Sequence, residues 1–119
     1  MIDPQIIFSF PKIESTATGG FRTKWTVPDQ LPYFDGHFPG NPILPAVAIL
    51  DASQEFLRLA GLPVNPLKLT LKKAKFLALV EPGMSLEISA EPLNAQWLVR
   101  WKNPEAARAQ SLCEVSFSL

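Results

Sequence analysis

Hydrophobic and polar residues alternate along most of the chain, and this period of two is typical of β-strands with one buried face. The pattern predicts a first strand from Ile6 to Phe10, closed by Pro11, and a second from Phe21 to Val27. It returns after the middle of the chain, where four more strands are predicted over residues 67–80, 84–90, 97–101 and 113–119. Within residues 67–80 the apolar positions change from odd to even numbers, a slip of one residue that predicts a β-bulge.

One segment between the second and third predicted strands has a different pattern. From Val47 to Leu59 apolar residues occupy most of a helical circumference, and Gly61 and Pro63 follow as stop signals. A helix that is apolar nearly all round is expected to be buried. One buried helix with about six antiparallel strands predicts an α+β fold, a single domain over residues 1–119 whose curved sheet wraps around the helix.

Composition and charge narrow the class of function. Eleven basic and eleven acidic residues balance, so no overall field draws the chain to nucleic acid or to a membrane surface. The first residues lack the pattern of a signal peptide, and no apolar run approaches the roughly 20 residues that span a bilayer. Cys113, the only cysteine, is expected to be a small core residue. We therefore expect a cytoplasmic protein that binds no nucleic acid and does not insert into membranes.

The candidate chemistry lies in the loop before the helix and in the helix itself. His37, the only histidine, stands among glycines and prolines that leave the loop few conformations. Asp51 follows fourteen residues later in the apolar helix. A stiff loop can hold a general acid or base at a set distance from a substrate. These two residues are the catalytic candidates, although a turn histidine and an aspartate at a polar dimer seam are the simpler alternatives.

Two segments resemble the β-hydroxyacyl-acyl-carrier-protein dehydratases of the FabA and FabZ type, which have the hotdog fold. Residues 37–52, HFPGNPILPAVAILDA, match the family's His-Phe-Pro start, its spaced prolines and its acid at the fourteenth offset. Residues 73–89, KAKFLALVEPGMSLEIS, are similar to the strand–turn–strand block of the family. The resemblance implies dehydration of 3-hydroxyacyl thioesters, carried on an acyl carrier protein, to trans-2-enoyl thioesters in fatty-acid or related acyl-chain biosynthesis. It implies no metal and no redox cofactor.

The resemblance also implies roles for individual residues. His37 takes the proton from C2, and Asp51 holds or protonates the departing hydroxyl, directly or through water. The family has a glycine at the opening of the helix, whose N–H binds the thioester carbonyl. This chain has Ala46 there, and its methyl group is expected to narrow the acyl channel or shift the loop. The substrate-binding candidates are Phe38, Pro45, Ala46, Val47 and Gln54.

An apolar helix that one thin sheet cannot cover favours a homodimer, and a higher oligomer of dimers stays open. In the resembling family each active site takes its histidine from one subunit and its acid from the other. Lys72, Lys73 and Lys75 are either a solvated strand face or a small basic patch for an acidic carrier protein. Two other functions stay open: a hotdog acyl thioesterase, and a non-catalytic hotdog subunit that completes a partner dehydratase. The sequence specifies neither the acyl chain length, nor an isomerase activity, nor the pathway.

Overall fold

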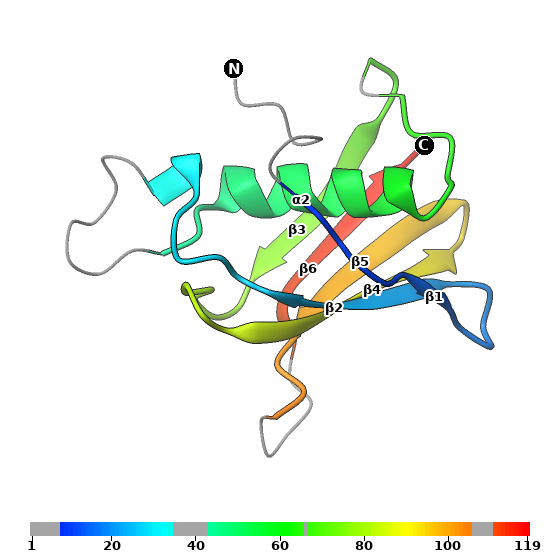
Figure 1. The fold of residues 1–119 in the computed structure, drawn as a ribbon. Coiled ribbons are helices and arrows are strands. Elements are labelled where there is room, and N and C mark those ends of the chain that lie inside the picture. Colours follow the sequence, from blue (N-terminus) through cyan, green and yellow to red (C-terminus); the bar gives the residue numbers. More distant parts are fainter. Residues whose placement is uncertain (1–7, 35–42, 66, 106–110) are drawn as a thin grey trace.

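The structure is a computed structural model and describes residues 8–34, 43–65, 67–105 and 111–119. Six strands form one antiparallel sheet in the order β1-β2-β4-β5-β6-β3, and one long helix, α2, lies across a face of it (Figure 1). In chain order the elements are β1 (Glu14–Ser15), β2 (Phe21–Thr26), the 3-10 helix η1 (Pro32–Phe34), α2 (Ala46–Leu59), β3 (Thr70–Phe76), β4 (Ser85–Leu93), β5 (Gln96–Lys102) and β6 (Ser111–Ser118). The α+β class is confirmed, as is the arrangement of one long helix against six strands among the described residues.

The first predicted strand is wrong within the described residues. Residues 8–10 form no strand, and residues 1–7 lie outside the described part of the chain. Phe8 and Phe10 are buried, and each ring packs edge-on against Trp25 with centroids 5.7 Å apart. The alternation there comes from two rings that pack on one core side chain, not from a ladder of backbone hydrogen bonds. The strand at this edge of the sheet is the short β1.

The core lies between α2 and the sheet. Alternate residues of the strands are buried on the face that the helix covers, as the period of two predicts. Trp101 of β5 and Ser53 of α2 are both fully buried, and the indole Nε1–H donates a hydrogen bond to the Ser53 hydroxyl at 3.0 Å. The main helix and strand residues of this core are Ala48, Ile49, Ala52, Phe56, Leu57, Leu86, Ile88, Ala90, Val99, Cys113, Val115 and Phe117.

Strand β3 forms one edge of the sheet, beside β6. Its register shifts between Leu71 and Lys73, so the predicted bulge is confirmed. Every residue of β3 is exposed. Leu71 and Phe76 pair with Phe117 and Cys113, which are buried beneath α2, so these two exposed side chains lie on the helix-covered face of the sheet. The helix does not reach far enough to cover them.

Candidate functional site

Helix α2 buries one side and leaves the other open, so the prediction of an all-round buried helix is wrong for the single chain. Its buried residues are Ala48, Ile49, Ala52, Ser53, Glu55, Phe56 and Leu57. Residues spaced by three and four along a helix share one face. Val47, Leu50, Asp51, Gln54 and Arg58 have this spacing and are half-buried or exposed, and we call them the open stripe. Three candidate site residues, Val47, Asp51 and Gln54, therefore lie together on one face.

The helix begins at Ala46, where the family resemblance predicts a carbonyl-binding group. Pro45 precedes the first turn in extended conformation, with φ −72° and ψ 161°, and no side chain caps the helix. The Pro45 carbonyl accepts hydrogen bonds from the N–H groups of Ala48 at 3.0 Å and Ile49 at 3.2 Å. The N–H groups of Ala46 and Val47 precede the first helical donors and have no acceptor within the helix. Both residues are exposed, so this end of the helix is open to a ligand.

The carboxylate of Asp51 has one hydrogen-bond donor among the described side chains. The hydroxyl of Tyr33, in η1, donates to Asp51 Oδ2 at 2.7 Å. Tyr33 is only 6% exposed, and its ring stacks on Phe8 with centroids 5.8 Å apart. Burial, and then the hydrogen bond and the negative charge of Asp51, hold the pKa of the Tyr33 phenol well above its ordinary value. The phenol is therefore a neutral donor at any physiological pH.

Sequence reasoning missed Tyr33. The available signal was its position, because the chain's only tyrosine stands four residues before its only histidine. His37 and Phe38 lie outside the described residues, so their predicted roles stay predictions. Gln54 is half-buried on the open stripe, and within the described part of the chain no hydrogen bond joins it to Asp51.

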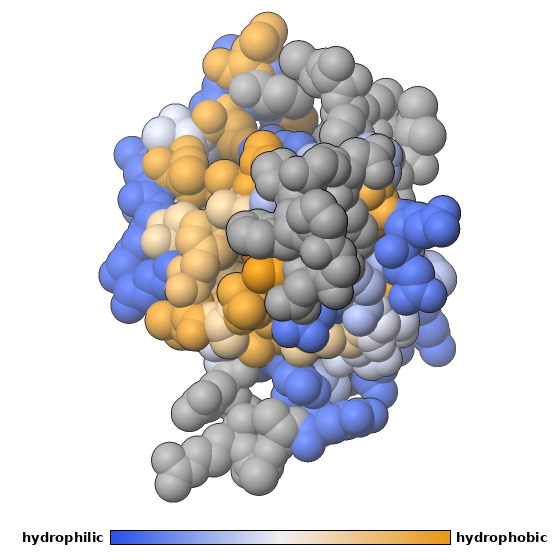
Figure 2. All heavy atoms as spheres, turned by 90° about the vertical axis from the view of Figure 1, so that its left-hand side faces the viewer, coloured by the Kyte–Doolittle hydropathy of each residue, from blue (hydrophilic) through white to orange (hydrophobic). Residues whose placement is uncertain are grey.

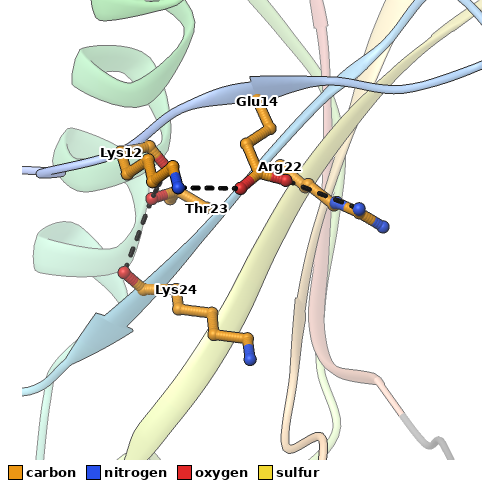
Figure 3. A network of polar contacts seen from close by, with 5 residues as sticks. All are labelled: Lys12, Glu14, Arg22, Thr23 and Lys24. Atoms are coloured by element: carbon orange, nitrogen blue, oxygen red, sulfur yellow. Dashed lines mark hydrogen bonds and ion pairs between the residues drawn. The ribbon is translucent and has the colours of Figure 1, made fainter.

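A polar hollow lies at the β1 edge of the sheet, opposite β3, and none of the predicted site residues lines it. It measures about 520 Å³ and lies between β2 and the segment that leads into β1. Figure 3 shows Lys12 and Arg22 reaching the same carboxylate, that of Glu14, at 3.9 and 3.5 Å. The hydroxyl of Thr23 donates to the Lys12 carbonyl at 2.9 Å. These contacts hold the segment against β2, and such exposed ion pairs contribute little to stability.

Three further observations concern the part of the chain that the structure describes. No three side chains of histidine, cysteine, aspartate or glutamate gather there as a metal site. Across the same residues, no helix combines the length and the apolar character needed to cross a membrane. Cys113 is fully buried, and burial raises the pKa of its thiol to about 12. A thiol with this pKa does not ionise near neutral pH, so the interpretation of Cys113 as a core residue is confirmed.

A protein-family model described as ApeI-like, ApeI dehydratase, matches residues 13–113. The chain belongs to the ApeI-like dehydratase family. Its curated relatives include 3-hydroxyacyl-acyl-carrier-protein dehydratases named FabZ. That of Chloroflexus aggregans is 42% identical over 66 residues, which are 50% of this chain and 46% of the relative. That of Sorangium cellulosum is 34% identical over 109 residues, 84% of this chain and 70% of the relative. The ApeI-like chain thus spans about half the length of several curated relatives it matches.

Solved structures agree on the fold. A chain of the dehydratase heterocomplex ApeI:P from Xenorhabdus doucetiae superposes with a TM-score of 0.71 at 18% identity, over 92% of this chain and 95% of that one. At this identity the likeness concerns the fold alone. Family, relatives and fold together confirm the resemblance that the sequence carries: the chain belongs to a dehydratase family, is similar to FabZ proteins and has the hotdog fold.

Proposed function

We propose that this protein dehydrates 3-hydroxyacyl thioesters to trans-2-enoyl thioesters, with an acyl carrier protein as the carrier of the acyl chain and acyl-chain biosynthesis as the setting. The main support is the position of Asp51 in a chain of a dehydratase family. Its carboxylate is half-buried on the open stripe, is bonded by Tyr33, and stands five residues after the uncapped start of α2. The same helix thus offers a ligand both a carboxylate and first-turn N–H groups that have no acceptor within the helix.

In the proposed reaction His37, Asp51 and the N–H groups at the start of α2 each have one role. Dehydration removes a proton from C2 and the hydroxyl from C3. His37 is the base for the C2 proton, since an imidazole accepts protons near neutral pH. Enolate charge then develops on the thioester oxygen, where the first-turn N–H groups at Ala46 and Val47 stabilise it. The departing hydroxyl is held by Asp51 and leaves as water after it gains a proton, which comes from protonated Asp51 or, with Asp51 ionised, is the C2 proton passed on from His37. The C3–O bond breaks as the alkene forms between C2 and C3, and any proton that Asp51 gives is replaced by the one on His37.

We further propose that the protein works as a homodimer. Large apolar side chains stay uncovered beside the helix and along the free edge of the sheet: Val47 at 57% exposure, Leu71 and Phe76 at 45%, Leu77 at 62% and Leu79 at 58%. Figure 2 looks at the side where α2 begins and β3 ends, and it shows broad apolar surface there beside a hydrophilic margin. An edge strand also offers unpaired backbone groups. A second copy related by a two-fold axis would cover this surface, and His37 would then act with Asp51 of the partner subunit.

Hydration of a crotonyl thioester, the reverse reaction, tests the activity. His37→Ala and Asp51→Asn should each lower turnover by about 10²–10⁴-fold, the usual contribution of a positioned acid or base. Glu87→Gln is the matched control, because it makes the same carboxylate-to-amide change on β4, away from the helix, and should keep full turnover. If Asp51→Asn keeps wild-type turnover, the assignment fails. Release of free thiol would identify a thioesterase instead, and a wild type that does neither would identify a non-catalytic subunit.

Co-expression tests the shared site. Neither His37→Ala nor Asp51→Asn homodimers contain an intact pair. A heterodimer of the two contains one intact site and one doubly damaged site, so a substantial part of the activity should return. Isolated heterodimers without recovery, or a fully active monomer, would refute the shared-site arrangement.

A further inference from the structure

We infer that Tyr33 is a positioning residue for the proposed reaction, whose hydroxyl fixes the orientation of the Asp51 carboxylate. The inference rests on the proposed function of Asp51. It adds a residue that the sequence motif did not point to, and it starts from a single contact, the hydrogen bond of 2.7 Å between the Tyr33 hydroxyl and Asp51 Oδ2.

Packing holds the two side chains of this hydrogen bond to different degrees. The ring of Tyr33 is almost fully buried and stacks on Phe8, so its hydroxyl is held at a fixed place. Asp51 is half-buried on the open stripe, next to the apolar side chains Val47 and Leu50 on the same face. Neither of these two neighbours can donate a hydrogen bond, and among the described contacts Gln54, the amide on the same stripe, makes none to Asp51. Because the last torsion of an aspartate has broad minima, its carboxylate needs a donor to hold one orientation.

The bond leaves the rest of the carboxylate available. Tyr33 binds Oδ2, and among the described residues no side chain binds Oδ1. A carboxylate accepts several hydrogen bonds through its two oxygens, so Oδ1 can face the substrate hydroxyl while Oδ2 is held. The donor stays protonated, since burial and Asp51 raise the pKa of the phenol. Tyr33 therefore acts through Asp51 and transfers no proton itself.

Tyr33→Phe is the direct test, because it removes the hydroxyl and keeps the ring that packs on Phe8. Loss of orientation at one reacting group costs up to about 10²-fold in rate. We expect kcat for hydration of the crotonyl thioester to fall about 10- to 100-fold, with KM changed less than about 3-fold, since the inference gives Tyr33 a role through Asp51 and none in substrate binding. Ser53→Ala is the control. It removes a buried hydrogen bond of the same helix, on the face opposite the open stripe, and should leave kcat unchanged.

A double-mutant cycle with Asp51→Ala separates a positioning role from a general structural one. If Tyr33 acts through Asp51, adding Tyr33→Phe to Asp51→Ala causes no further loss of turnover. A further loss of about 10-fold would overturn the inference. Wild-type kcat in Tyr33→Phe, with Asp51→Asn inactive, would overturn it and leave the proposed function standing. Full activity in Asp51→Asn would instead refute the proposed function.

The hydrogen bond can also be measured without activity. Tyr33 is the chain's only tyrosine, so growth on 3-fluorotyrosine places one fluorine probe at this ring and nowhere else. The ¹⁹F resonance should shift on Asp51→Ala and stay in place in Glu87→Gln. An unchanged resonance in Asp51→Ala would mean that the contact is not made in solution, and the inference would fall even if Tyr33→Phe folds poorly.

Discussion

The hydrogen bond between Trp101 and Ser53 allows a prediction about stability that is independent of the reaction. Both residues are fully buried, and the bond joins the centre of α2 to the centre of the sheet. Ser53→Ala deletes the acceptor and leaves the indole N–H of Trp101 buried without a partner. We expect the variant to be clearly less stable than wild type.

The magnitude follows from two opposing effects. A buried donor left unsatisfied costs about 1–3 kcal/mol, whereas alanine is a better helix former than serine by about 0.5 kcal/mol. The free energy of unfolding should therefore fall by about 0.5–2.5 kcal/mol. A chain of 119 residues has an unfolding entropy of roughly 250 cal/mol/K. This converts the loss into a decrease of about 2–10 °C in Tm.

Thermal unfolding at one fixed protein concentration measures this decrease. Ser85→Ala is the matched control, because the Ser85 hydroxyl also has a hydrogen-bond partner, the hydroxyl of Thr26 at 3.2 Å, but at an exposed site. Water replaces that partner, so Tm should stay within about 2 °C of wild type. If Ser53→Ala unfolds at the wild-type Tm or above it, the reasoning that the Trp101 donor depends on Ser53 is refuted.

Three further predictions concern the proposed substrate and dimer. Ala46→Gly removes an exposed methyl at the helix opening and should raise activity on longer acyl chains relative to crotonyl, whereas an unchanged chain-length preference would leave the methyl without a role. Lys73→Glu combined with Lys75→Glu, on the exposed outer face of β3, should raise KM for a carrier-protein substrate but not for a coenzyme A thioester. The control Lys24→Glu, on β2, should raise neither KM. If the double variant has the wild-type KM for the carrier-protein substrate, this face of β3 is not the docking site. Phe76→Asp should yield monomers in sedimentation, while Leu93→Asp, at a similarly exposed site of 52%, should not; a dimeric Phe76→Asp protein would exclude the β3 surface as the interface.

Much of the fold follows from the sequence, because a strand with one buried face must alternate. The residues of β2 and β4 alternate in burial as their polarity predicts, those of β6 do so except at the buried Ser116, and the slip in the apolar pattern is the bulge of β3. The start of α2 after Pro45 is also predictable, since a helix begins readily behind a residue held in extended conformation. These features are local, so the chain's own periodicity specifies them.

The sequence predictions that are wrong or incomplete concern features that depend on tertiary contacts. Phe8 and Phe10 alternate like a strand, but both rings pack on Trp25. The helix is apolar nearly all round, yet one sheet covers only half of it. The position of Tyr33 near the chain's only histidine was an available signal, but its contact with Asp51, eighteen residues away, depends on how η1 packs against α2, and sequence spacing does not predict that packing.

The open stripe of α2 bears on the proposed reaction because it carries Asp51. This stripe is only partly covered by its own chain, and it carries Asp51 beside the apolar side chains of Val47 and Leu50. A carboxylate that assists the loss of a hydroxyl works best where water is excluded, because electrostatic interactions are stronger there. A second subunit over Val47 and the edge of β3 would remove water from Asp51 and complete the site in one step. Phe76→Asp should therefore abolish turnover even though Phe76 belongs to no proposed binding or catalytic group. A monomeric Phe76→Asp protein that keeps wild-type turnover would separate dimerisation from catalysis and refute the argument.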